Sequence, residues 1–371
     1  MLKIGTFTLI LSAVGLALLA ALIVGGWERF PPSMYEPSVE RARPGQEDSI
    51  KRAAFANDRL WLLSDAGELW TVKQTISEAK RMERPKAVFD FCIQDDGPVI
   101  VTGEPGAAAA WTLLRWKDAE WTIFGSVASN GDGLVAVQCA ADRLLMLTTR
   151  RIIELQGAQQ KSLKLSHRIP ARVPNVILTT PTHIFVGLNA GEWGGGLQRV
   201  DRRTGEVVAP QRNTSGDLCG GPLNPDCDPV SGLAPSVDKP GCVVAAVGLR
   251  HMGTHGRIIE VCGDRVERLY TGPCPDGLPR DELTRTGRDG KRLCTEAFSG
   301  VMQKGGALVA VSASGVSTVD KAGVAVRTPL PRFADYGPFA VNFSSPDVVL
   351  VRSSANQRSS LGGDVPLLVA R

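Results

Sequence analysis

The stretch GLVAVQCAADRLLMLTTRRIIEL (133–155) holds three short apolar runs, LVAVQ, LLMLT and RIIEL. The turn AAD separates the first run from the second. Short apolar runs that are bounded by turn residues are typical of β-strands. The stretch therefore predicts three consecutive short strands.

The central run of this stretch recurs along the chain. Most copies follow a turn, an apolar strand usually lies just upstream, and further short strands follow downstream. The seven copies start at Leu60, Val99, Leu144, Ile184, Val243, Leu308 and Val348 and are spaced by 39, 45, 40, 59, 65 and 40 residues. Four short strands in about 40 residues are typical of a β-propeller blade. The 322 residues from Ile50 to Arg371 give 46 residues for each of seven repeats.

The two long spacings place insertions near 212–230 and 274–294. The pattern predicts an all-β chain, a seven-bladed β-propeller with two enlarged blades. Six or eight blades, and a pair of β-sandwiches or two smaller barrels, remain as alternatives. The last blade shows only three strands, PFAVNF, VVLVR and VPLLVA, and the segment Ser38–Arg43 could supply the missing outer strand. The alternative is a three-stranded last blade.

Composition agrees with a turn-rich globular chain. The 371 residues include 40 Gly and 24 Pro, which disfavours a helical bundle. The 42 Lys and Arg residues against 38 Asp and Glu residues leave too small a net charge to suggest a nucleic-acid partner.

One turn resembles a known repeat family. The segment DRRTGEVV (201–208) resembles the D-x-x-T-G turn of quinoprotein-type propeller repeats, and KDAEWTIF (117–124) and DKAGVAV (320–326) are looser echoes. The resemblance covers the blade pattern and implies no particular activity. WD dipeptides, a repeated tryptophan docking motif and a quinone-binding signature are missing, so most of the seven tryptophans are interpreted as packing between blades.

The N-terminus predicts a membrane anchor. Residues 4–27 carry no charge over 24 positions, and about 20 apolar residues span a bilayer as a helix. The sequence thus divides into a single transmembrane helix or signal anchor (1–29), a Pro-rich tether (30–49) and the propeller (50–371). Lys3 precedes the run, which favours export of the remainder to the extracytoplasmic side, the periplasm in a bacterium. A cleaved signal peptide is the alternative.

Eight cysteines also favour export, since an even number in an exported chain suggests disulfides. Cys242 and Cys262 flank a predicted hairpin. Pairing Leu249 with Arg257 leaves them two places out of register, and a shift of one residue at each end of the loop sets them opposite. By elimination, the other predicted pairs are Cys92–Cys139, Cys219–Cys227 and Cys274–Cys294. Free buried thiols or exchanged partners are the alternatives.

The candidate ligand site lies on two loops of neighbouring blades. In a propeller, the connections between the second and third strands share one face, which places NAGEWGGG (189–196) beside RHMGTHG (250–256). The loops bring together a carboxylate, an indole, a guanidinium and two imidazoles, namely Glu192, Trp193, Arg250, His251 and His255. Such a set suits a ligand or, through the two histidines, a metal. Plain Gly-rich turns are the competing interpretation.

Two further segments are weaker candidates. CGGPLNPDCDP (219–229) could offer oxygens of Asn224, Asp226 and Asp228 to a hard cation, although a turn beside a disulfide is the simpler interpretation. The loop 273–294 carries five basic and four acidic residues, and it is interpreted as either a solvated loop or a docking segment.

Catalytic and cofactor signatures are missing, including G-x-S-x-G, H-E-x-x-H and G-x-x-x-x-G-K-[ST]. We therefore expect no cofactor. We expect a membrane-tethered binding or scaffold module that takes a protein or a small ligand on its loop face, rather than an enzyme. The alternative is a propeller enzyme, a lactonase-like hydrolase or a quinoprotein relative, with a metal on that face.

Overall fold

The computed structural model describes residues 50–370 apart from several gaps, which are 57–58, 65, 74–78, 84, 86, 96, 104–109, 172–174, 211–220, 251–253, 275–293, 313, 330–338, 344–347 and 354–366. The predicted anchor, the tether and the segment Ser38–Arg43 lie outside the described residues. Within the described part of the chain, no helix has the length and apolar character needed to cross a membrane.

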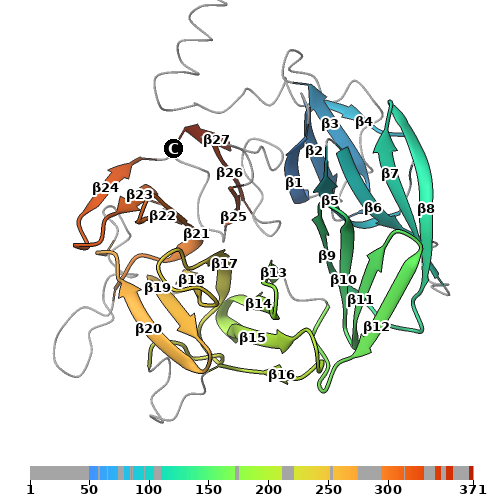
Figure 1. Cartoon of the computed structure of the whole chain (residues 1–371). Helices are drawn as coiled ribbons and strands as arrows, with labels where there is room; N and C mark the ends of the chain where they lie inside the picture. The colour runs from blue at the N-terminus through green and yellow to red at the C-terminus, as the bar shows by residue number, and fades with distance from the viewer. Residues whose placement is uncertain are drawn as a thin grey trace, which may run out of the picture.

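The chain forms a ring of antiparallel sheets, each built from strands that are consecutive in sequence (Figure 1). Six sheets have four strands, and we number these blades 1 to 6; the last sheet has three strands. Blade 1 consists of β1 (Ile50–Ala56), β2 (Arg59–Ser64), β3 (Leu69–Lys73) and β4 (Ala79–Arg81). Blade 2 consists of β5 (Val88–Gln94), β6 (Gly97–Thr102), β7 (Ala110–Lys117) and β8 (Glu120–Ala128). Blade 3 consists of β9 (Leu134–Ala140), β10 (Arg143–Thr148), β11 (Arg151–Gln156) and β12 (Gln159–Lys164).

The second half repeats this arrangement. Blade 4 consists of β13 (Asn175–Thr179), β14 (His183–Asn189), β15 (Gly195–Asp201) and β16 (Val207–Val208), with the short 3-10 helix η2 (Gly191–Trp193) between β14 and β15. Blade 5 consists of β17 (Val230–Pro235), β18 (Val243–Arg250), β19 (Thr254–Cys262) and β20 (Arg265–Tyr270). Blade 6 consists of β21 (Phe298–Lys304), β22 (Ala307–Ser312), β23 (Gly315–Val319) and β24 (Ala325–Thr328), and the last sheet of β25 (Phe339–Asn342), β26 (Val348–Ser353) and β27 (Leu367–Ala370).

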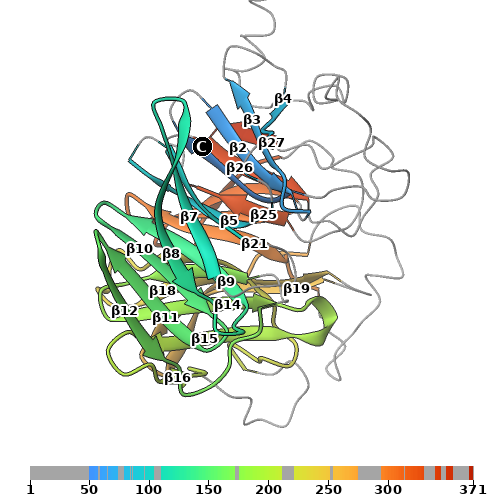
Figure 2. The same cartoon turned by 90° about the vertical axis from the view of Figure 1, so that its right-hand side faces the viewer.

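The β-propeller prediction is confirmed, and the predicted count of seven blades needs a correction. Six blades are complete, and β25–β27 form a sheet without a fourth strand among the described residues. Each repeated apolar run starts within two residues of the second strand of a sheet. Figure 1 draws the last sheet between blade 6 and blade 1, Figure 2 shows the same ring from the side, and β25 contacts β21 of blade 6. The sandwich and barrel alternatives are excluded by this sheet order.

The hydrophobic core is divided among the boundaries between neighbouring blades. One cluster joins Val99 and Trp111 of blade 2 to Met146 and Ile153 of blade 3, and similar clusters fill the boundaries between blades 1 and 2, 3 and 4, 4 and 5, and 5 and 6. The expected role of tryptophan is confirmed at Trp61 of blade 1, whose ring contacts two tryptophans of blade 2. Each blade therefore depends on its neighbours for burial of its apolar faces.

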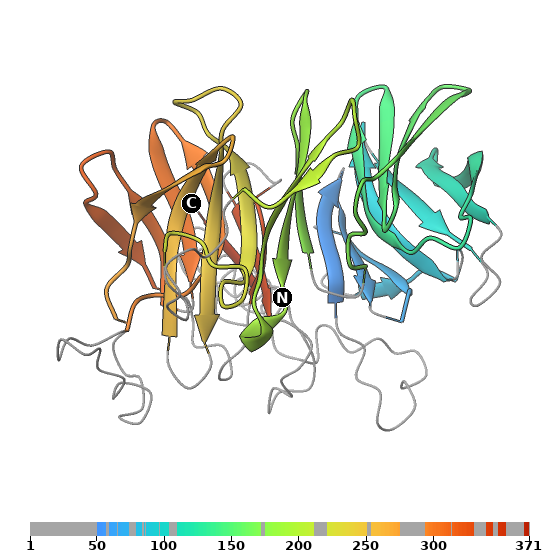
Figure 3. The ribbon, with the colours of Figure 1, turned by 90° about the horizontal axis from the view of Figure 1, so that it is seen from below.

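The antiparallel order fixes two faces of the ring (Figure 3). We call one of them the loop face. It carries the connections between second and third strands, including η2, and the connections between consecutive blades, because first and third strands run in the same direction. β1 also starts on this face.

Three predicted disulfides are confirmed, namely Cys92–Cys139, Cys242–Cys262 and Cys274–Cys294. Cys227 is also disulfide-bonded, and Cys219 lies outside the described residues. Among the described cysteines none is free. Val243 pairs with Val261, so Cys242 faces Cys262 in the shifted register, with a Cα–Cα distance of 4.5 Å. That spacing is typical of a non-hydrogen-bonded antiparallel pair.

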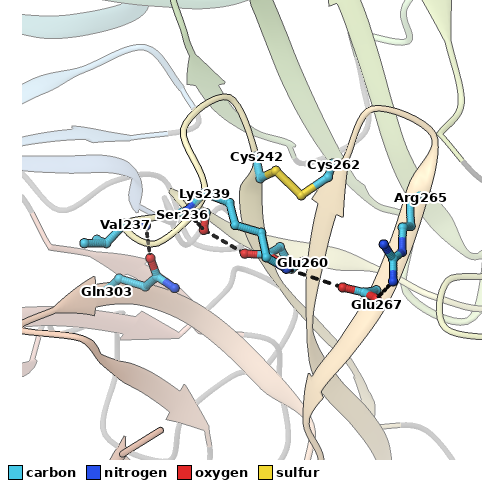
Figure 4. The surroundings of a disulfide bond; sticks show 9 residues. All are labelled: Ser236, Val237, Lys239, Cys242, Glu260, Cys262, Arg265, Glu267 and Gln303. Carbon is cyan, nitrogen blue, oxygen red and sulfur yellow. Dashed lines mark hydrogen bonds and ion pairs between the residues drawn. A yellow bond between two sulfur atoms is a disulfide. The ribbon is translucent and has the colours of Figure 1, made fainter.

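The Cys242–Cys262 bridge lies beside a polar network on the opposite face from η2 (Figure 4). Buried Glu260 accepts hydrogen bonds from Ser236 at 2.7 Å and from Lys239 at 2.5 Å. The bond to Glu260 raises the pKa of Lys239. The network and the disulfide together fix the turn between β17 and β18.

Candidate functional site

Trp193 is the most exposed large hydrophobic side chain among the described residues, at 80 %. It ends η2, which contacts β18 as the loop-face prediction requires. Arg250 ends β18, but the structure does not describe its side chain or that of Glu192. His251 lies outside the described residues. The structure therefore places η2 against β18, and it leaves the joint site of five residues as a prediction.

The backbone beside Trp193 is fixed by the segment that precedes β17. Gly195 donates a hydrogen bond to the carbonyl of Pro225 at 2.8 Å, and Gly196 donates to the carbonyl of Asp228 at 2.8 Å. Gly194 has a φ of 82°, and a Cβ there would lie 2.2 Å from the Pro225 oxygen. Only glycine fits such a close approach. Trp193 is thus presented on a well-supported loop.

The same segment buries a carboxylate. Asp228 is fully buried, and its Oδ2 accepts hydrogen bonds from the guanidinium of Arg257 and from the Asn224 backbone. Arg257 is also buried, and it donates to the carbonyl of Pro222 at 2.6 Å. The guanidinium therefore neutralises Asp228 and ties β19 to the segment before β17.

Three buried polar atoms in and around this carboxylate have no hydrogen bond, and we call them open. Asp228 Oδ1, Asn224 Nδ2 and His255 Nε2 are all buried, and none has a hydrogen-bond partner. His255 Nε2 lies 3.4 Å from Asp228 Oδ1, within ion-pair distance, but the geometry makes no hydrogen bond. Buried polar atoms without a hydrogen bond are costly, and three of the twelve among the described residues gather around this one carboxylate.

The donor set does not fit a cation. Asn224 Oδ1 accepts the N–H of Asp226 at 3.0 Å, which leaves its Nδ2, a donor, as the open atom. The Arg257 guanidinium already occupies the other carboxylate oxygen. Asp226 itself is exposed. The hard-cation option for Asn224, Asp226 and Asp228 is therefore not supported, and within the described residues no three His, Cys, Asp or Glu side chains gather as metal ligands.

A repeated position at the end of the second strand differs between blade 5 and the other blades. In blades 1, 2, 3, 5 and 6 the first residue of the first strand pairs with one residue of the second strand, and a β-bulge follows this pair. The second-strand residue is the last of its strand in blades 1, 2, 3 and 6, and it lies three residues before the end in blade 5. We call that second-strand residue the rim residue. The rim residues are Ser64, Thr102, Thr148, Val247 and Ser312. Blade 5 alone among these five lacks a hydroxyl.

Blades 3 and 6 show what the rim hydroxyl does. Each has an acid two residues before its first strand, as blade 5 has in Asp228. Thr148 donates to Asp132 at 2.9 Å, and Ser312 donates to Glu296. Arg151 and Arg327 pair with these acids at 2.7 and 2.6 Å. The sequence analysis missed this acid, hydroxyl and arginine pattern, although the recurring Ser or Thr at the end of the second strand was a visible signal.

The D-x-x-T-G resemblance has a clear structural counterpart. Asp201 accepts the backbone N–H groups of Arg203 at 2.7 Å and Thr204 at 2.8 Å. These bonds lower the pKa of Asp201. Gly205 adopts a φ of 75°. The motif is thus a turn between β15 and β16 and contributes to the blade, not to a site.

Comparison with known proteins supports the fold. No protein-family model matches the chain, and a search of curated proteins finds no match. Among solved structures, YCF48 bound to D1 peptide is 12 % identical with a TM-score of 0.53, over 90 % of this chain and 98 % of that one. BamB from Moraxella catarrhalis is 11 % identical with a TM-score of 0.44, over 93 % and 96 %. The chain has a β-propeller fold.

Proposed function

We propose that this protein is a membrane-tethered, extracytoplasmic binding module that holds a partner on its loop face around Trp193. The observation that carries the proposal is an indole 80 % exposed on a loop fixed by glycine packing and backbone hydrogen bonds. A large aromatic group held in place before binding loses little conformational entropy on contact. Residues that dominate interfaces are often of this kind.

Three further observations support it. The solved YCF48 structure is described as bound to a peptide, which gives a precedent for a propeller of this general fold as a peptide-binding protein. The disulfides are consistent with an oxidising compartment outside the cytoplasm. The uncharged run at 4–27 is long enough to anchor the chain. The metal-dependent enzyme alternative stays a prediction, because His251 and the side chain of Glu192, two of its three candidate ligands, lie outside the described residues.

Peptide selection tests the binding proposal. A displayed random-peptide library is selected on the purified protein, and the selected peptides are titrated against Trp193→Ala. We expect at least a tenfold loss of affinity, because truncating an interface hot spot costs about 2 kcal/mol or more. Ile123→Ala is the matched control, since Ile123 is 73 % exposed on β8, away from the loop face. Peptides that bind Trp193→Ala as tightly as the wild type would contradict the proposal.

The location is tested separately. Membranes from cells that make the native protein are washed with alkaline carbonate, and the N-terminus of the retained protein is sequenced. A tethered protein stays in the membrane fraction with residues 1–27 intact and is digested by protease added from the extracytoplasmic side. A mature N-terminus near 25–29 would instead show a cleaved signal.

A further inference from the structure

The rim residue decides how many hydrogen bonds a buried acid receives. In blade 3 the hydroxyl of Thr148 lies 2.9 Å from Asp132, and in blade 6 the hydroxyl of Ser312 donates to Glu296. The register-equivalent residue of blade 5 is Val247, which pairs with Val230 and has no polar atom. Asp228 therefore lacks the hydroxyl donor that its counterparts have, and its Oδ1 is open.

The open atoms define the chemistry of what would fit. Asp228 Oδ1 requires a donor, and Asn224 Nδ2 requires an acceptor. A hydroxyl group supplies both, because its O–H donates and its oxygen accepts. An anion would be repelled by Asp228, and a cation would meet the guanidinium of Arg257, which already neutralises that carboxylate. A neutral hydroxyl is thus the favoured group, as it is in blades 3 and 6.

The surroundings add a surface for a larger molecule. Gly196 is hydrogen-bonded to Asp228 and lies three residues from exposed Trp193. The side chain of His255 is 28 % exposed while its Nε2 is buried, so the imidazole extends from the surface to the carboxylate. A saccharide combines hydroxyl groups with an apolar ring face. The flat apolar surface of an indole can pack against that face.

We infer that the Asp228 cluster is a binding site for a neutral saccharide. One sugar hydroxyl takes the place of the missing rim hydroxyl, donating to Asp228 Oδ1 and accepting from Asn224 Nδ2, and His255 turns aside to admit it. The sugar ring lies toward Trp193. The inference rests on the proposed binding function of the loop face and names the class of ligand.

The substitution Val247→Thr tests the site at the cost of one buried methyl group, which the hydroxyl replaces. It supplies the rim hydroxyl from within the chain and so blocks the place of the ligand. The full-length protein in detergent is titrated by calorimetry with a panel of neutral mono- and disaccharides. We expect at least one sugar to bind the wild type and to lose at least tenfold in affinity in Val247→Thr. Val101→Thr is the matched control, because Val101 is an equally buried valine on β6.

Each other outcome overturns the inference. If no sugar of the panel binds, or if Val247→Thr binds as the wild type does, the cluster is not a saccharide site. If Val247→Thr is only more stable and the wild type binds nothing, the open oxygen holds water. If peptides selected on the protein lose affinity in Trp193→Ala but not in Val247→Thr, the binding function stands and the saccharide site does not.

Discussion

Blades 3 and 5 solve the same problem in different ways. Both have a buried acid two residues before the first strand and an arginine from a later strand that neutralises it. In blade 3 the hydroxyl of Thr148 and the guanidinium of Arg151 both donate to Oδ2 of Asp132. In blade 5 Val247 cannot do so, and His255 stands 3.4 Å from the unsatisfied oxygen without a hydrogen bond. Blade 5 thus has a methyl group where blade 3 has a hydroxyl, and one oxygen of its acid has no hydrogen bond.

The comparison teaches where to look for function in a repeat protein. The same position recurs in five blades, so its ordinary role is visible in the blades that keep it. A departure stands out only against those copies. In blade 5 the departure lies beside the loop that exposes Trp193, since η2 contacts β18.

The largest expected effect comes from removing the arginines. Arg257→Met leaves Asp228 buried without a counter-charge, and we expect a loss of about 3–5 kcal/mol in the free energy of unfolding. Arg151→Met should cost less, because Asp132 keeps the bond from Thr148. Urea denaturation of the two variants measures the difference. Equal losses would show that the rim hydroxyl does not help to hold the acid.

Removal of a disulfide is expected to have the next largest effect on the free energy of unfolding. The loss should be larger for the disulfide that ends in blade 3 than for the one within blade 5. Cys92–Cys139, which ties blade 2 to blade 3, spans 47 residues, whereas Cys242–Cys262 within blade 5 spans 20. The chain-entropy model gives about 4 and about 3 kcal/mol. Double alanine variants of each pair, compared by denaturation, test this order. A reversed order would mean that the stability losses arise from changes in the native state rather than from the entropy of the unfolded chain.

Removing the hydroxyl from blade 3 should make it resemble blade 5. Thr148→Val removes one of the two donors to Asp132 Oδ2, which still accepts from Arg151 at 2.7 Å, and it also removes the acceptor for the N–H of Arg151 at 2.8 Å. We expect destabilisation by about 1–3 kcal/mol. A thermal melt compared with that of the wild type measures it. A loss below about 0.5 kcal/mol would contradict the importance given to the rim position.

The reverse change should have a smaller and opposite effect. Val247→Thr adds the missing donor, and we expect a gain of up to about 1 kcal/mol, since a new hydrogen bond is offset by desolvation of the hydroxyl. The melting temperature in the absence of sugars is the measurement. A clear destabilisation would show that the new hydroxyl cannot reach Asp228.

The smallest effect involves blade 6, where the acid has an aromatic neighbour. Burial, and after it the charge of Glu296, raises the pKa of Tyr270 above 10.0. The folded state then holds the phenol proton more tightly than the unfolded chain, so stability falls as the pH rises above about 10 toward the folded-state pKa. Tyr270→Phe should flatten this part of the stability profile. If the free energy of unfolding, measured by urea denaturation at alkaline pH, depends on pH in Tyr270→Phe as it does in the wild type, other groups cause the dependence.

The fold could be predicted because the propeller repeats a local signal. Apolar runs at the second strand of every sheet are adjacent in sequence to their partners, so periodicity and turns were enough. The Cys242–Cys262 register followed from the same local reasoning. The missing strand of the last sheet was also visible as a pattern of three runs. Its proposed donor, the segment Ser38–Arg43, stays a prediction.

The site was predicted only in part, because its contacts join segments that are far apart in sequence. Sequence reasoning placed Trp193 and His255 on one face and singled out Asp228. It could not foresee that the guanidinium of Arg257 would pair with the carboxylate of Asp228, since 29 residues separate them. Nor could Val247 be noticed as an exception before strand registers showed which residues are equivalent.

The start of β1 on the loop face constrains how a partner would approach. Whatever precedes Ile50 joins the propeller on the side that carries Trp193. With the proposed anchor, that side would look toward the bilayer, and a tether of residues 30–49, fully extended, would reach at most about 70 Å. Molecules confined near the membrane would then meet Trp193 at a raised local concentration.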